Sequence, residues 1–508
     1  MADPARTLQT FRSLGVDIAR VAVLWNTIAP APYSHDRPRH FAATNPSAYP
    51  AVKWKPYDAI VKYASRDGVE PDFLLNGAAP LWATGPAPTQ TERSSGLWNP
   101  SPAEYRQFVQ AVATRYSGHY RPPGASKPLP RVHFWEVWNE PNWGNSLQPQ
   151  LALDPPRIVS AVEYRSLLDA AWSAFHHTGH GGDTIVIGSL SPRGATAPPK
   201  SSRAVQAAVD VSSPIGFTRI LYCVDSAYQP LRGRAAVLAD CPTTADGSQQ
   251  FRQAHPGLFG ASGYGMHPYP INGPPTEADA ANPDTVEFGE IPNLERALDR
   301  VQSAYGSSKR MIIYNTEYGY VTHPPNAATG YVAPATAARY LNWAEYLTWR
   351  DPRIASTMQY LLYDPDPKPD VFGPGGFSTG LIFYHGKPKP TFYAYRMPIY
   401  LPVTSTTRGS ALEVWGCARP APNAYLDTHR HQQVQIQFRS ARSHSFRTIR
   451  TVRLAAAHTC YFDVSARFPA SGSVRLSWSY PSDDPRLKDP ITPGQRTIYS
   501  RAVAIVVR

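Results

Sequence analysis

The sequence predicts an α/β protein in which a parallel barrel is followed by an all-β, sandwich-like domain. Apolar strands alternate with helix-patterned stretches through most of the chain, and two of these strands end in a Glu within an aromatic-rich motif. From Leu401 the pattern changes to short strands of strictly alternating polarity. Alternation of strands with helices favours a parallel sheet, and period-two alternation indicates strands with one buried face. We therefore expect a barrel domain at residues 1–400 and a β-sandwich accessory domain at residues 401–508.

Seven apolar stretches are the predicted barrel strands. They are residues 18–25, 72–76, 132–138, 184–188, 261–266, 310–315 and 356–362. Helix-like intervals separate them, at residues 57–66, 102–116, 162–176, 292–305 and 334–349, and an eighth helix is expected at 393–399. A strand that precedes the first helix is missing, because only residues 1–6 stand there. We favour a truncated N-terminus, with a miscalled start site or another form of closure as alternatives; a missing strand would expose two sheet edges.

The accessory domain is predicted from three alternating segments. They are residues 434–438, 474–478 and 502–506. A basic run at residues 439–450 could bind polyanions, but such a run is more often the solvated side of a strand and its loop. We adopt the second interpretation.

Composition limits the partners of the chain. The net charge of +12 favours anionic neighbours such as an acidic polysaccharide or the cell envelope. An Arg-rich surface without a nucleic-acid site is the simpler interpretation, and it is the one we adopt. No apolar run approaches the roughly 20 residues of a membrane span, and no apolar signal segment stands at the N-terminus of this chain. The oligomeric state is left open.

The positions of the four cysteines indicate whether the protein contains disulfides. Cys223 and Cys241 lie in one region and Cys417 and Cys460 in another, with no C-x-x-C pair that would suggest a zinc or thioredoxin-like site. We predict Cys223–Cys241 and Cys417–Cys460 disulfides, with four free thiols as the alternative. Disulfides would fit a secreted or cell-envelope protein.

Two Glu residues are the candidate reactive groups. Glu140 follows the strand 132–138 directly after Asn139, and Glu317 ends a later apolar strand in the run Tyr-Asn-Thr-Glu-Tyr-Gly. In a parallel barrel the carboxyl ends of the strands share one face, where the loops close over a substrate. Hydrolysis of a glycosidic bond requires two such carboxyl groups.

The motif Trp-x-x-Trp-Asn-Glu-Pro-Asn around Glu140, with Thr-Glu-Tyr-Gly around Glu317, resembles clan A of the glycoside hydrolases. The pattern is most similar to family 39 and its actinobacterial relatives, over roughly the first four-fifths of the chain. The resemblance implies a (β/α)8 TIM barrel and a double displacement that retains anomeric configuration. It implies Glu140 as general acid/base and Glu317 as nucleophile, with no metal and no organic cofactor.

Further site residues are predicted around this pair. Asn139 is expected to donate to the sugar hydroxyl next to the anomeric carbon. The resemblance implies that Tyr269 hydrogen-bonds Glu317 while His267 meets the sugar. Arg20 has two interpretations: a buried pair with Glu136, or a position next to Glu317 that supports the nucleophile.

Aromatic and acidic residues complete the expected binding site. Sugar rings have apolar faces that suit flat side chains, so Trp82 and Trp143 are candidate platforms. Tyr363 and Asp364 follow the last barrel strand and are expected to contact the sugar bound there, with Asp366 as the alternative to Asp364 for that hydrogen bond. Three histidines, His176, His177 and His180, are interpreted as helix-capping residues and not as metal ligands.

The favoured function is a secreted retaining glycoside hydrolase that acts on an oligo- or polysaccharide. A barrel that binds polysaccharide without cleaving it, and an envelope-associated protein that uses its basic β-domain, are the alternatives. The relatives implied by the resemblance act on xylosides, iduronides, arabinosides and exopolysaccharides. Pyranose or furanose, and exo or endo action, therefore stay open.

Overall fold

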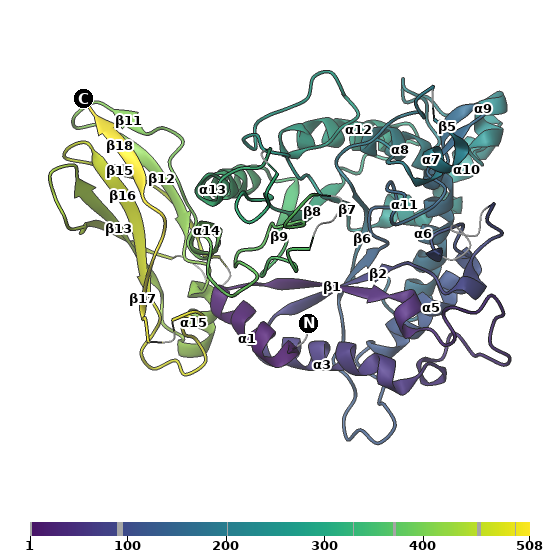
Figure 1. The fold of residues 1–508 in the computed structure, drawn as a ribbon, viewed down its shortest axis with the longest axis horizontal. Helices are drawn as coiled ribbons and strands as arrows, with labels where there is room; N and C mark the ends of the chain where they lie inside the picture. Colours follow the sequence, from purple (N-terminus) through teal and green to yellow (C-terminus); the bar gives the residue numbers. More distant parts are fainter. Residues whose placement is uncertain are drawn as a thin grey trace.

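The computed structural model describes residues 3–88, 95–200, 202–328, 330–368, 372–454, 459–492 and 494–508 (Figure 1). Its centre is a parallel seven-stranded sheet in the order β1-β2-β3-β6-β7-β8-β9. These strands are β1 (Ile18–Leu24), β2 (Glu70–Asn76), β3 (Phe134–Val137), β6 (Thr184–Leu190), β7 (Gly263–Met266), β8 (Ile312–Tyr318) and β9 (Ile354–Gln359). All seven predicted barrel strands are confirmed.

The helices before and after these strands pack around the sheet (Figure 1). They are α1 (Pro4–Leu14), α2 (Trp25–Ile28), α3 (Ala51–Asp67), α5 (Pro102–Arg115), α6 (Ser160–His177), α12 (Ile291–Ser303), α13 (Pro334–Arg350) and α14 (Pro390–Arg396). A side chain fixes the start of α5, where Ser101 accepts a hydrogen bond from the N–H of Glu104. The sequence did not predict the small helices between β6 and β7, which are α7 (Ala204–Val209), α8 (Pro214–Leu221), α9 (Gly233–Leu238), α10 (Ala245–Ala254) and α11 (Pro256–Gly260). A hairpin of β4 (Leu151–Leu153) and β5 (Pro156–Ile158) precedes α6.

The barrel sheet has a seam between β1 and β9, the two ends of its strand order among the described residues. Every residue of β3 is buried, whereas no residue of β9 is. A cavity of about 980 Å³ runs along this seam, bordered by β1, β9 and α1. The helix α1 begins at Pro4, so no strand precedes it within the described residues, and residues 1–2 lie outside them.

The C-terminal residues form two antiparallel sheets with a shared apolar core. One contains β10 (Ile399–Tyr400), β12 (Ala411–Cys417) and β15 (Tyr461–Arg467). The other contains β11 (Ser405–Thr406), β13 (Gln433–Ser440), β14 (Arg447–Arg453), β16 (Gly472–Ser479), β17 (Thr497–Tyr499) and β18 (Val503–Val507), with β11 joined to β18 in parallel. Val414 of the first sheet and Ile436 of the second belong to one core cluster. Six of the seven residues of β14 are exposed, which confirms the solvated interpretation of the basic run there. A helix, α15 (Ala421–Thr428), interrupts the predicted all-β pattern.

Both predicted disulfides are confirmed. Cys223 is bonded to Cys241, and Cys417 at the end of β12 is bonded to Cys460 just before β15. Within the described ranges, none of the helices combines the length and apolarity that a membrane crossing needs.

The two parts of the chain are joined by polar contacts beside α1, α13 and α14 (Figure 1). Arg396 of α14 forms a buried ion pair with Asp489, with 2.5 Å between Nη1 and Oδ2. The hydroxyl of Tyr480 donates to the carbonyl oxygen of Ser13 at 3.0 Å. These contacts fix the C-terminal sheets against the barrel.

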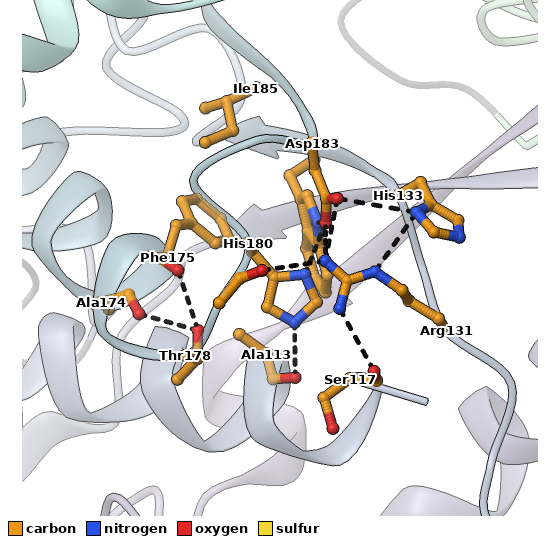
Figure 2. A network of polar contacts seen from close by, with 12 residues as sticks. Ala113, Ser117, Arg131, His133, Ala174, Phe175, Thr178, His180, Asp183 and Ile185 are labelled. Atoms are coloured by element: carbon orange, nitrogen blue, oxygen red, sulfur yellow. Dashed lines mark hydrogen bonds and ion pairs between the residues drawn. The ribbon is translucent and has the colours of Figure 1, made fainter. Parts of the chain in front are cut away.

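A polar network fixes the N-terminal ends of β3 and β6 (Figure 2). Asp183 accepts hydrogen bonds from Arg131 at 2.9 Å and lies 2.6 Å from Nδ1 of His180, whose Nε2 lies 3.0 Å from the carbonyl oxygen of Ala113. His176 and His177 lie in the last turn of α6, as predicted. This network therefore has a structural role at the face opposite the strand ends that carry the candidate site.

Candidate active site

The fold brings the carboxyl groups of Glu140 and Glu317 near the same ring nitrogen of one buried histidine, His267. Glu140 follows β3, and Glu317 lies in β8, three positions further along the sheet. Nδ1 of His267 lies 3.0 Å from Oε1 of Glu140 and 3.7 Å from Oε2 of Glu317. These two carboxyl oxygens are thus less than about 7 Å apart, which is compatible with the ~5–5.5 Å carboxyl separation of a retaining glycosidase.

The backbone around Glu140 turns sharply at the end of the strand. Trp138 and Glu140 have φ values of 65° and 41°, in the left-handed region that residues other than Gly seldom occupy. The N–H of Glu140 donates to the carbonyl oxygen of Ser189 at 2.9 Å and so anchors this turn to the end of β6. Only 8% of Glu140 is exposed, and burial raises the pKa of its carboxyl group to about 7. Glu140 can therefore hold a proton near neutral pH.

Glu317 has a different environment. Arg20 forms an ion pair with its Oε1, and the hydroxyl of Tyr269 donates to its Oε2 at 3.0 Å. The β8–β9 register shifts between Asn315 and Tyr318, so that Glu317 lies within an irregular stretch of the strand. A cation and a hydroxyl donor stabilise negative charge on this carboxyl group.

Arg20 satisfies both of its predicted interpretations at once. Its Nε donates to Oε1 of Glu136 at 2.6 Å while its Nη1 contacts Glu317. Burial lowers the pKa of Arg20, but the two carboxylates outweigh burial and raise it above the ordinary value. Arg20 therefore stays charged between two acidic groups.

The position of His267 differs from the prediction. The side chain is completely buried, and it contacts the two Glu carboxyl groups where we expected it to meet a sugar. Burial lowers the pKa of His267 to about 4, so the imidazole is neutral near pH 7. A neutral ring can share a proton with Glu140 without adding charge to the site.

Asn139 lies on the seam cavity, as do Arg20 and Glu317. Its Oδ1 accepts from Nη2 of Arg20 at 3.1 Å. Among the described residues, no hydrogen bond to its side-chain nitrogen is found, so this N–H2 group can donate to a ligand. Glu140 does not line the seam cavity. Its carboxyl group contacts His267 instead.

The predicted aromatic platforms lie away from this cavity. Trp82 packs edge-on against Trp25, and its Nε1 donates to the carbonyl oxygen of Pro30 at 3.0 Å. Trp143 is half-buried, and its backbone N–H donates to the carbonyl oxygen of Glu140. Of the predicted aromatic residues, Tyr363 does line the cavity, with 46% of its surface exposed.

The prediction that Asp364 contacts a sugar is wrong. Its carboxylate is buried, with 2.7 Å between Oδ1 and Nζ of Lys389, which is buried as well. The N–H of Gly380 also donates to Oδ1 at 3.0 Å. The loop after β9 directs this side chain inward, where it fixes the loop and is not open to a ligand.

Three further residues contribute to the site. Asn76 ends β2, lines the cavity and accepts the N–H of Asn139 at 3.1 Å. Ser189 ends β6 and binds Glu136, while Tyr360 follows β9 and packs edge-on against Tyr269. Polar or aromatic residues at strand ends were the available signal for all three. Across the described ranges, no group of three or more His, Cys, Asp and Glu residues is placed to hold a metal ion.

Comparison with known proteins finds similar folds only. No protein-family model matches the chain, and no curated protein sequence matches it significantly. Among solved structures, a glucosidase from Croceicoccus marinus is 12% identical with a TM-score of 0.48, covering 91% of this chain and 89% of its own. A family 1 β-glucosidase from Thermotoga maritima is 14% identical with a TM-score of 0.43, covering 74% and 80%. An endo-β-1,4-mannanase from Thermotoga petrophila is 10% identical with a TM-score of 0.39, covering 99% and 94%. Such loose similarity carries no functional argument, so any function must be argued from the site itself.

Proposed function

We propose that this protein is a retaining glycoside hydrolase that cleaves an oligo- or polysaccharide, with Glu140 as general acid/base and Glu317 as nucleophile. The observation that carries the proposal is the pair of carboxyl groups whose oxygens lie 3.0 and 3.7 Å from Nδ1 of His267. Glu140 is buried with a raised pKa, whereas Glu317 is paired with Arg20. Two carboxyl groups with opposite protonation are what acid-assisted displacement requires.

The reaction would proceed in two steps. Glu317 attacks the anomeric carbon and forms a glycosyl ester while Glu140 gives its proton to the departing oxygen. Esterification removes the negative charge of Glu317, which lowers the proton affinity of Glu140. Glu140 then takes a proton from water as that water displaces Glu317, and the sugar leaves with its original configuration.

The test begins with a panel of nitrophenyl glycosides and of plant and bacterial polysaccharides, assayed with the wild type and with Glu317→Ala. We expect cleavage by the wild type alone, and proton NMR of the first product should show retained configuration. Equal cleavage by the two proteins would show that Glu317 is not the nucleophile. Binding without cleavage across the panel would favour a polysaccharide-binding barrel.

A trapping experiment identifies the nucleophile directly. A 2-deoxy-2-fluoro glycoside of the substrate sugar, with a good leaving group, should leave an ester on Glu317 that mass spectrometry locates. The matched control is Glu345→Gln, because Glu345 is also a buried Glu bonded to an Arg and a Tyr hydroxyl but lies on α13. This control should be labelled as the wild type is. An adduct on any other residue would refute the assignment.

A further inference from the structure

Glu136 is a completely buried carboxylate beneath the candidate site. It lies in β3, four residues before Glu140. Its oxygens accept two hydrogen bonds from Arg20, at 2.6 Å from Nε and 3.0 Å from Nη2, and a third from the hydroxyl of Ser189. Sequence reasoning treated Glu136 as half of a structural ion pair, but its partners connect it to both carboxyl groups of the site.

One connection runs through Arg20. The guanidinium group that Glu136 holds on one side contacts Glu317 and Asn139 on the other. The second connection runs through Ser189, whose hydroxyl binds Glu136 and whose carbonyl oxygen accepts the N–H of Glu140. Gly265 makes this second contact possible, because a Cβ at that position would lie only 2.3 Å from Oγ of Ser189.

The protonation of Asp72 affects how much negative charge lies beside Arg20. Its side chain is completely buried on β2, and neither carboxyl oxygen meets a donor from another residue. A buried carboxylate without a donor is unfavourable, so this environment favours the protonated form of Asp72, which could donate to Glu136. Burial, followed by the negative charge of Glu136, raises the pKa of Asp72 well above its usual range. The opposite directions of these two pKa shifts favour negative charge on Glu136, which is the carboxyl group bonded to Arg20.

We propose that Glu136 is a positioning residue for both Glu140 and Glu317. Glu136 orients Arg20 toward Glu317, and its negative charge offsets the charge of Arg20, so that Glu140 keeps its proton. The catalytic role of Glu136 rests on the proposed function, whereas its effect on the protonation of Glu140 does not. Burial raises the pKa of Glu140, and the charge of Arg20 acts to lower it. Among the described residues, the titratable groups that face Glu136 or Glu140 include Arg20 of β1, Asp72 of β2, Tyr164 of α6, His267 after β7, Tyr269 beyond it, Glu317 of β8 and Tyr360 after β9.

The deciding experiment is a carbon-13 NMR titration of the Glu140 carboxyl group in protein labelled at Glu, with the signal identified by its loss in Glu140→Gln. In Glu136→Gln the charge of Arg20 is less well offset, so we expect the pKa of Glu140 to fall by roughly one pH unit or more. Asp183→Asn is the control, because it alters a carboxylate with an Arg partner at the opposite end of the same strands. That control should leave the Glu140 titration unchanged. An unchanged titration in Glu136→Gln would overturn the proposal.

Two further variants guard against misfolding of Glu136→Gln. Glu136→Asp keeps the charge and should restore most of the Glu140 titration, and a shift as large as that of Glu136→Gln would contradict the proposal. Asp72→Asn replaces a protonated donor by an amide donor, so it should fold and titrate like the wild type. If it shifts the Glu140 titration by a pH unit or more, Asp72 carries a charge and the account is wrong. Because no substrate is needed, these measurements stand even if no glycoside is cleaved, and that failure would count against the proposed function alone.

Discussion

Two clusters in this molecule have the same three components. Glu317 contacts Arg20 and the hydroxyl of Tyr269, while Glu345 contacts Arg419 at 2.5 Å and accepts the hydroxyl of Tyr461 at 2.8 Å. The first lies at the end of a barrel strand, and the second joins α13 to the C-terminal sheets.

The surroundings of the two clusters differ. Arg20 is shared with Glu136, and Glu317 lies close to a second carboxyl group through His267. Arg419 instead donates to the carbonyl oxygen of Tyr395, which ties it to the backbone of α14. An Arg-paired Glu is thus no mark of function by itself. A second carboxyl group close by, with a pKa raised by burial, is the feature that suits catalysis.

The largest expected effect is the difference in kcat between variants of the two clusters. Glu317→Gln should lose several orders of magnitude in kcat, because no other group can form the ester. Glu345→Gln should retain kcat but lower the Tm, since breaking a buried ion pair costs on the order of 3 kcal/mol. Kinetics and thermal unfolding of both variants measure the difference. Similar losses of kcat in the two would remove the distinction between them.

The second prediction concerns the acid beside Glu317. Glu140→Gln should lower kcat/KM by roughly 10²–10⁴-fold on substrates with poor leaving groups, which need proton transfer. On activated aryl glycosides the loss should be much smaller, because those leaving groups depart as anions. A loss of equal size on both substrate types would argue against the acid role.

A smaller effect is expected in the pH dependence of the wild type. Because burial raises the pKa of Glu140 to about 7, kcat/KM should fall as the pH rises through about 7 and the acid loses its proton. Glu140→Gln should lack this alkaline limb, whereas Glu345→Gln should keep it. If kcat/KM falls in the same way in all three proteins, a group other than Glu140 causes the fall.

The smallest effect is on stability. The pKa of Glu140 is raised in the folded state, so its contribution to stability is fully present below the unfolded value of about 4.3 and is lost as the pH rises through about 7. Glu140→Gln should therefore have a higher Tm than the wild type at pH 8 and nearly the same Tm at pH 4. Thermal unfolding at the two pH values measures this, and a Tm gap that does not change with pH would show that Glu140 ionises as it does in the unfolded chain.

The sequence by itself determined the order of the seven barrel strands, both disulfides and the strand-end positions of Glu140 and Glu317. These features depend on local periodicity, on cysteine positions, and on the rule that parallel strands present their carboxyl ends on one face. The seven strands and the basic, solvated β14 follow from such patterns because each is a property of neighbouring residues.

Only the tertiary structure decided the roles that depend on side-chain direction. Asp364 was predicted to face a ligand, but its loop turns it onto Lys389, and His267 is buried between two carboxyl groups. Strands that are distant in sequence let Glu136 and Glu317 share Arg20, and they raise the pKa of Asp72 by burying it beside Glu136. Proton affinity depends on burial and on charges a few ångströms away, which no stretch of consecutive residues specifies.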